Sequence, residues 1–530
     1  MKKNGLFKNL GESALTLSAS VLIVKIIGVI YKVPLTYILG TGGMGYFNAA
    51  YTVYGFFYTV ASAGIPKAVT IYIKREESGE GKEAGGEICK ISMRAFGIFG
   101  FLVTLLYILL AKPISVLIGN SAAFYSILAI GPSVFFVVLS GVARGYLTAR
   151  AGIVDIAISQ LIEALSKLGL GLLFAFAGYR LGISIPMISA FSILGITLGS
   201  IFSAVYLLIC TKIAKTKEKA GQNTRLCKTL LDKKTVLREV FTLSLPITLS
   251  ASLLSASSLV DLGIIMRILK AGGLDEAAAS AEYGSFTTLA IPMLMLVSSI
   301  ITPICVPLLP KLTECACLGR REDFRKALGT SSMKVSLLCA PATLCFMLYP
   351  FDILDVLFSS QDSVMGAELL ALISPSVIFL PVLTVVNTGL EAIGRIRSTV
   401  ISLTLGAAVK SVLAACLIAI PEVGIRGAAI STSLSYLFSL VYSLVALTRE
   451  VGSIGVCRYA LSAFTLSLVS YAPVYHFLYS RVPVGSSFFK LMICGGIGTA
   501  LYVALTVITM FFKAKLVKPS SKCTKNAEYN

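Results

Sequence analysis

The chain has 530 residues, of which 56% are hydrophobic and 14% are charged, and its mean hydropathy is +0.87. A soluble protein carries about a quarter charged residues, so this composition excludes an ordinary soluble protein and predicts a polytopic membrane protein. The formal net charge of +20 does not require a nucleic acid partner, because most Lys and Arg fall at the termini and in alternate connections between apolar runs. This positive-inside pattern predicts that both termini are cytoplasmic.

Apolar runs separated by Gly, Pro or charged residues predict an all-α fold with about fourteen transmembrane helices. An even number agrees with two cytoplasmic termini, and the first run is expected to be a retained span rather than a cleaved signal. The predicted spans are 12–39, 45–74, 90–111, 121–148, 153–178, 184–211, 239–269, 280–310, 324–350, 364–391, 397–420, 425–448, 456–479 and 487–512.

The two halves of the chain resemble each other in sequence. A Pro-Ser-Val triplet occurs at 132–134 and again at 375–377, and the same offset aligns Lys167 with Lys410. This shared offset predicts a parallel repeat, in which two pseudo-symmetric six-helix lobes face each other across a central cavity. The predicted parts are an N-terminal lobe 1–211, a basic cytoplasmic linker 212–238, a C-terminal lobe 239–448, two further spans in 449–512 and a cytoplasmic tail 513–530.

The first predicted span contains two lysines. Lys25 and Lys32 are seven residues apart, so they share one helical face, with Gly28 between them on nearly the same side. Pro34 favours a kink one turn beyond the middle of the span. An ammonium group in a membrane span normally faces a polar cavity or a partner, although a lysine side chain can instead extend to the interface.

Three further lysines within predicted spans are candidate ligands. Lys67 follows Pro66 at an expected helix break, or it anchors a helix end; Lys167 and Lys410 occupy equivalent positions in the two halves. Cations on facing helices with few acids nearby repel one another unless an anion binds. The lysines therefore predict an anionic substrate site, with phosphate as the obvious candidate.

Two acidic residues are candidates for coupling. Glu163 lies one turn before Lys167, so it either neutralises that lysine or acts as a titratable switch. Asp261 either binds a coupling cation or pairs with Arg267. The 12 cysteines show no metal-ligand spacing, and the chain offers no nucleophile–base pair. We therefore expect no metal, no cofactor and no enzymatic activity.

Several motifs resemble one known family. Residues 25–35, KIIGVIYKVPL, and 45–51, GYFNAAY, are similar to the opening of the stage V sporulation protein B-like polysaccharide transporters. Further matches are Ala63-Gly64-Ile65-Pro66, Gly145-Tyr146-Leu147, Ile158-Ser159-Gln160 and Leu309-Pro310-Lys311-Leu312. The resemblance covers essentially the whole chain and implies membership of the multidrug/oligosaccharidyl-lipid/polysaccharide (MOP) exporter superfamily.

Distant kin of that family are the MurJ-type lipid II flippases, which have fourteen spans and a cationic cavity. The resemblance makes Lys25, Tyr31 and Lys32 ligands of a substrate diphosphate. Those flippases also have a basic residue at the start of span 8, whereas residues 281–286 of this chain contain none. This difference counts against lipid II itself as the substrate. It does not count against polyprenyl-diphosphate sugars as a class.

The expected function is that of a flippase in the bacterial cytoplasmic membrane. It would translocate an undecaprenyl-diphosphate-linked saccharide, a peptidoglycan precursor such as one for the spore cortex, by alternating access. The expected substrate ligands are Lys25, Lys32, Lys67, Lys167, Tyr31 and Lys410, and the expected coupling residues are Glu163 and Asp261. The expected partners are the lipid-linked saccharide, membrane lipids and a coupling H⁺ or Na⁺, with the protein as a monomer.

Two other functions agree with fewer features of the sequence. A drug or organic-cation antiporter of the same superfamily typically has twelve spans and an acidic binding site. A polytopic glycosyltransferase needs an outer loop rich in Asp, Glu or His, and the predicted outer loops are short and nearly lack these residues.

Overall fold

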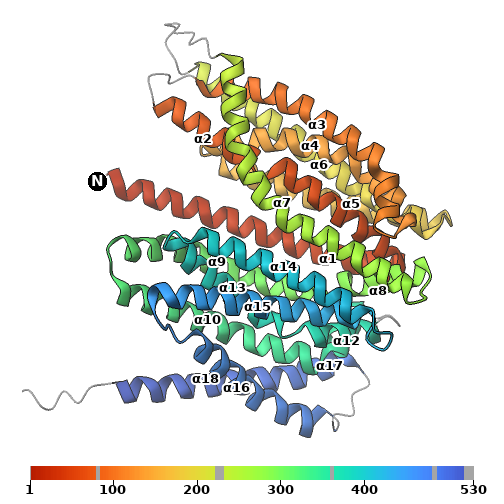
Figure 1. Ribbon diagram of the computed structural model, residues 1–530, viewed down its shortest axis with the longest axis vertical. Helices are drawn as coiled ribbons and strands as arrows, with labels where there is room; N and C mark the ends of the chain where they lie inside the picture. Colours follow the sequence, from red (N-terminus) through yellow and green to blue (C-terminus); the bar gives the residue numbers. More distant parts are fainter. Residues whose placement is uncertain are drawn as a thin grey trace, which may run out of the picture. The chain divides into compact units, whose positions relative to one another are not determined.

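The computed structural model describes residues 2–78, 84–220, 232–358, 363–479, 481 and 486–517, and every regular element in these ranges is a helix (Figure 1). The predicted all-α class is therefore confirmed. Ten helices are long and apolar enough to cross a membrane, or eleven if one bent pair counts as a single span. The number of fourteen spans is not established by the described residues and stays a prediction.

The helices up to the middle of the chain are α1 (Lys2–Ser62), α2 (Ile65–Ser78), α3 (Ala84–Leu117), η1 (Ser121–Ala123), α4 (Phe124–Ala149), α5 (Ile153–Arg180), α6 (Ile185–Ala220), α7 (Lys233–Ala271), α8 (Glu276–Ser285) and the π-helical turn η2 (Phe286–Ala290). The remaining helices are α9 (Ile291–Cys317), α10 (Arg321–Leu348), α11 (Pro350–Phe358), α12 (Ser363–Ile373), α13 (Ser376–Ala392), α14 (Ile396–Ile418), α15 (Arg426–Val451), α16 (Val456–Val474), η3 (Tyr475–Tyr479), α17 (Ser487–Lys490), η4 (Leu491–Gly495) and α18 (Gly496–Val517).

The chain forms two compact units. The first contains residues 1–303 and 397–439, and the second contains residues 304–396 and 440–530. The predicted linker 212–238 overlaps the ends of α6 and α7, and its residues 221–231 lie outside the described part of the chain. The division into lobes 1–211 and 239–448 stays a prediction.

Helix α1 is a hairpin rather than one straight rod. Gly40 interrupts it with φ 64° and ψ 177°, a backbone conformation that is essentially restricted to glycine. Lys32 and Asn48 lie on opposite sides of this break, with Lys32 Nζ 3.4 Å from Asn48 Oδ1. Sixteen residues of continuous helix would separate them by about 24 Å along the axis, so the chain reverses direction at Gly40.

The same hairpin accounts for the first two predicted spans. The apolar segment Ser20–Glu77 has 58 residues, about 87 Å of helix, whereas a bilayer core is about 30 Å thick. With the reversal at Gly40, this length suits two crossings. The second arm is broken again between Ser62 and Ile65, where the Gly64-Ile65-Pro66 sequence predicted a helix break.

In the first unit, α1 packs against α4, α5, α6, α7 and α8, and α5 packs closely along α6. A side chain at Gly195 of α6 would overlap the backbone of Gly171 in α5. Tyr31 of α1 lies beside the same place, because a Cβ at Gly171 would be 2.8 Å from the Tyr31 hydroxyl. These small residues let α5 and α6 approach each other and seat α1 against both.

In the second unit, α10 packs against α13 and α16, and α16 packs against α18. The predicted span 364–391 is a bent pair, α12 and α13, with an angle of 41° at Ser374 and Pro375. A cavity of about 320 Å³ lies in this unit, lined by residues that include Cys315, Arg321 and Glu450. It contains none of the lysines predicted to bind substrate.

Candidate functional site: embedded lysines of the first unit

The two lysines of the first α1 arm contact neutral groups of the helices that follow the middle of the chain. Lys25 Nζ donates to Ser299 Oγ of α9 at 2.9 Å. Lys32 Nζ donates to the backbone carbonyl oxygen of Thr287 at 3.2 Å and to Asn48 Oδ1 at 3.4 Å. Lys25 as a whole is exposed and Lys32 is half-buried.

The partner of Lys32 lies in a π-helical turn. Thr287 belongs to η2, where the regular i→i+4 ladder of the helix is interrupted. Asn48 Nδ2 donates to Thr288 Oγ1 of the same turn at 2.7 Å. The second α1 arm and η2 thus hold Lys32 from two sides. The contact with Thr287 also places the Lys32 ammonium next to the segment 281–286, which has no basic residue of its own.

Lys167 of α5 lies between two aromatic rings. Its Nζ is 5.0 Å from the ring centroid of Tyr31 and 4.9 Å from that of Tyr51. Tyr31 is fully buried, and its hydroxyl donates to the Ser192 carbonyl oxygen at 3.3 Å. Tyr31 was expected to contact substrate, but its burial makes it a support for Lys167, through cation–π attraction.

These three lysines share one electrostatic property. Among the described residues, no carboxylate lies within ion-pair distance of Lys25, Lys32 or Lys167. Their contacts are a hydroxyl, a carbonyl, an amide and aromatic rings, which satisfy hydrogen bonds without cancelling charge. Lys32 and Lys167 are also close enough to repel each other. The group is a site of excess positive charge in the membrane-spanning part of the chain, and Glu163 acts on Lys167 only from beyond ion-pair distance.

Lys410 differs from these three lysines. Its Nζ is 2.7 Å from Asp261 Oδ2, and the neighbouring Ser411 Oγ donates to Asp261 Oδ1 at 2.9 Å. Asp261 is 6% exposed, so the pair between α7 and α14 is largely buried. The expected alternatives for Asp261 were a cation or Arg267; its partner in the structure is Lys410. The charge of Lys410, expected to bind diphosphate, is neutralised here.

Glu163 also has an unexpected partner. Its Oε2 is 3.6 Å from Arg144 Nη2 of α4, whereas Lys167, the expected partner one turn along α5, contacts the two tyrosines. Arg144 also interacts with Tyr58 of α1. Sequence reasoning missed Arg144 as a site residue, although its position inside the predicted span 121–148 was a usable signal.

The structure does not bring Lys67 to the other lysines. Lys67 is exposed on α2, sixteen residues beyond Tyr51. The helix is broken between Ser62 and Ile65, and within the described residues no hydrogen bond or ion pair joins Lys67 to the other lysines. Its role as a ligand of the same diphosphate stays a prediction.

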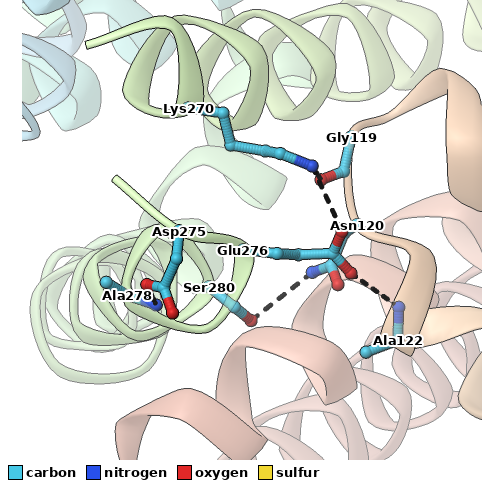
Figure 2. A network of polar contacts seen from close by, with 8 residues as sticks. All are labelled: Gly119, Asn120, Ala122, Lys270, Asp275, Glu276, Ala278 and Ser280. Atoms are coloured by element: carbon cyan, nitrogen blue, oxygen red, sulfur yellow. Dashed lines mark hydrogen bonds and ion pairs between the residues drawn. The ribbon is translucent and has the colours of Figure 1, made fainter. Parts of the chain in front are cut away.

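The helix ends near Gly40 are joined by a polar network, which Figure 2 shows. Lys270 at the end of α7 contacts Glu276 Oε2 of α8 at 3.1 Å and donates to the Gly119 carbonyl oxygen at 3.2 Å. The backbone N–H of Ala122 donates to Glu276 Oε1 at 2.8 Å. The connection between α3 and α4 is thereby held to the connection between α7 and α8.

Helix α8 also packs tightly on the α1 turn. Ser280 Oγ donates to the Gly42 carbonyl oxygen at 3.2 Å, and Asn120 Nδ2 donates to Ser280 Oγ at 3.4 Å. A Cβ at Gly45 would overlap Ser280, and a Cβ at Gly284 would overlap the Thr41 backbone. At this end α1 and α8 are in backbone contact.

The number of long apolar helices defines a multi-pass membrane protein. The chain belongs to the family described as polysaccharide biosynthesis protein, whose model matches residues 10–315. The family expected from residues 25–51 is thereby confirmed.

Two relatives from Bacillus subtilis (strain 168) align along most of the chain. Stage V sporulation protein B is 22% identical over 454 residues, which cover 85% of this chain and 86% of the relative. Lipid II flippase MurJ is 22% identical over 447 residues, covering 81% of this chain and 80% of the relative. A solved structure of lipid II flippase MurJ in an inward closed conformation matches with a TM-score of 0.65 at 14% identity, over 95% of this chain and all of that one.

Proposed function

We propose that the protein is a flippase for an undecaprenyl-diphosphate-linked saccharide, a peptidoglycan precursor, in the bacterial cytoplasmic membrane. The observation that carries this proposal is that Lys25, Lys32 and Lys167 have, among the described residues, no carboxylate within ion-pair distance. Cations within a membrane span are costly without acidic partners, and a diphosphate would supply the missing negative charge. The name of one relative, lipid II flippase, supports the same class of substrate.

The proposed mechanism needs no covalent step. The headgroup enters from the cytoplasmic side, where both termini lie, and the diphosphate binds Lys25, Lys32 and Lys167 while the lipid tail remains in the bilayer. Rocking of the helices then opens the Gly40 end to the outer leaflet. For coupling to H⁺ or Na⁺, the candidates are the embedded pairs Arg144–Glu163 and Lys410–Asp261, since neutralising either acid frees a cation. A monomer suffices for this cycle.

The test uses purified protein in liposomes that contain a fluorescent undecaprenyl-diphosphate disaccharide. Transfer between leaflets is followed by quenching with a membrane-impermeant reductant. Lys25→Ala and Lys32→Ala are each expected to slow flipping about tenfold or more, because a charge-assisted hydrogen bond contributes about 1.5–3 kcal/mol.

The matched control is Lys112→Ala, an exposed lysine in the predicted connection between the third and fourth spans, which should flip at the wild-type rate. Lys25→Arg should retain part of the activity because it keeps the charge. Wild-type flipping by both alanine variants would overturn the proposal.

A further inference from the structure

The second arm of α1 carries a row of aromatic side chains along one face. Phe47, Tyr51, Tyr54 and Tyr58 follow one another at spacings of four, three and four residues, and consecutive ring centroids are 6.2, 6.1 and 5.6 Å apart. This spacing keeps the rings on one side of the helix. From Tyr51, which contacts Lys167, the row extends about 10 Å toward α2.

Within this row the side chains are not equally covered. Phe47 is 1% exposed and Tyr54 is 4% exposed, whereas Tyr51 is 43% exposed. Gly55 lies four residues after Tyr51 and three before Tyr58, and a Cβ built on it would meet nothing within 4 Å. Tyr51 and Tyr58 therefore border an open space above Gly55, which we name the Gly55 gap.

The surroundings of the gap are polar rather than lipid-like. The Lys167 ammonium lies over the Tyr51 ring, and a lysine in a membrane span does not face hydrocarbon without a partner. At the other end, Tyr58 interacts with Arg144, whose guanidinium pairs with Glu163. The gap thus has aromatic faces on its sides and charged hydrogen-bonding groups at both ends.

This combination fits a sugar ring. The C–H faces of a pyranose pack on aromatic rings, while its hydroxyl groups need donors and acceptors at the rim of the site. An acyl chain would use the rings but would leave Lys167, Arg144 and Glu163 without any new partner. In a lipid-linked saccharide the first sugar is bonded directly to the diphosphate, and the gap adjoins the lysine proposed to bind that group.

We propose that the Gly55 gap binds the first sugar of the substrate, packed against the aromatic row at Tyr51 and Tyr58. This inference rests on the proposed flippase function and deepens it, because it makes the protein recognise the saccharide and not only the diphosphate. The hydroxyl groups of the sugar would accept hydrogen bonds from Arg144 and donate to Glu163. This ion pair would then distinguish a glycosylated lipid from one without a sugar.

The test compares binding of two probes to detergent-solubilised full-length protein: undecaprenyl diphosphate, and the same lipid carrying a disaccharide. The wild type is expected to bind the glycosylated lipid more tightly. Gly55→Leu fills the gap and leaves the contact between Tyr51 and Lys167 intact, so it should weaken binding of the glycosylated lipid about tenfold and leave binding of undecaprenyl diphosphate unchanged.

Two further variants keep the test decisive if Gly55→Leu does not fold. Tyr58→Ala should show the same selective loss, and Tyr58→Phe should retain binding because stacking needs only the ring. Gly496→Leu is the matched control, since Gly496 is also a helical glycine with nothing near its Cβ but lies in the second unit. It should bind both probes as the wild type does.

Equal loss for both probes, or no loss for either, would overturn the gap as a sugar site. Equal wild-type affinity for the two probes would also overturn it, while leaving the diphosphate site in place. Failure of the wild type to bind undecaprenyl diphosphate at all would instead contradict the proposed function itself. The two failures are therefore distinguishable.

Discussion

The carboxylate of Asp261 has both oxygens engaged by adjacent residues of α14, Lys410 and Ser411. A single substitution therefore leaves a charge without its partner in a largely buried position. Such an unpaired charge costs more than the pair contributes, because desolvation of the remaining ion is no longer offset. This makes the pair a sensitive reporter of how α7 and α14 are held together.

We expect Asp261→Ala to lower the free energy of unfolding by about 3 kcal/mol, and Lys410→Ala to lower it by a similar or smaller amount. The double variant should be more stable than the sum of the two losses predicts, because neither charge is then left alone. Thermal unfolding of the four proteins in detergent measures this coupling. Strictly additive losses would mean that the two residues do not interact.

Glu163 shows a limit of reasoning from spacing. An i,i+4 acid and base on one helix can pair, but such a local pair contributes only about 0.3–0.5 kcal/mol. A guanidinium from α4 and two tyrosine rings from α1 compete with it, and the structure has these tertiary contacts instead. They could not be predicted without knowing which helices are neighbours.

At the scale of the element, the α1 hairpin depends on one backbone conformation. Gly40 has φ 64° and ψ 177°, where a residue with a Cβ is strained by about 1–3 kcal/mol. The reversal at Gly40 is what places Lys32 opposite Asn48. A change there should therefore affect both the stability of the first unit and the geometry of the lysine site.

Gly40→Ala is expected to lower the unfolding temperature and to slow flipping. Gly28→Ala is the matched control, since Gly28 lies in the same helix and a Cβ on it would meet nothing within 4 Å. In a helix interior alanine is favoured over glycine by about 1 kcal/mol, so the control should be as stable as the wild type or more stable. Equal unfolding temperatures for both variants would contradict the role of Gly40.

Local patterns predicted this element well and its contacts poorly. The seven-residue spacing predicted that Lys25 and Lys32 share a face, and Gly28 between them has open space at its Cβ. Their partners Ser299 and Thr287 are 274 and 255 residues away in the chain, so no window of sequence could reveal them. The π-helical form of η2 likewise has no pattern in sequence periodicity.

At the scale of the whole molecule, the proposed cycle requires the Gly40 end of the first unit to open. There α1 and α8 touch through Gly42, Gly45, Ser280 and Gly284, and the Lys270–Glu276 pair ties in the connection before α4. Within the first unit, backbone contact leaves no passage between these two helices.

A disulfide can test whether the closed end must open. A Cβ at Gly42 would lie 4.0 Å from the Ala281 Cβ, within the usual range for a disulfide. The Gly42→Cys/Ala281→Cys protein should flip lipid under reducing conditions and stop after oxidation, with activity restored by reductant. Each single variant should be insensitive to oxidant. Full activity of the cross-linked protein would show that transport does not pass this end.

The described residues place no carboxylate within ion-pair distance of Lys25, Lys32 or Lys167, and this also has an electrical consequence. An empty carrier holds excess positive charge on this site, and each unit charge that crosses the field of the membrane changes the free energy by about 2.3 kcal/mol per 100 mV. A diphosphate cancels most of that charge, so a negative-inside potential acts mainly on the empty return step and draws the vacant site back toward the cytoplasm. The resting voltage would then set the turnover rate, and imposing potassium diffusion potentials of opposite sign on the liposomes should speed and slow flipping respectively.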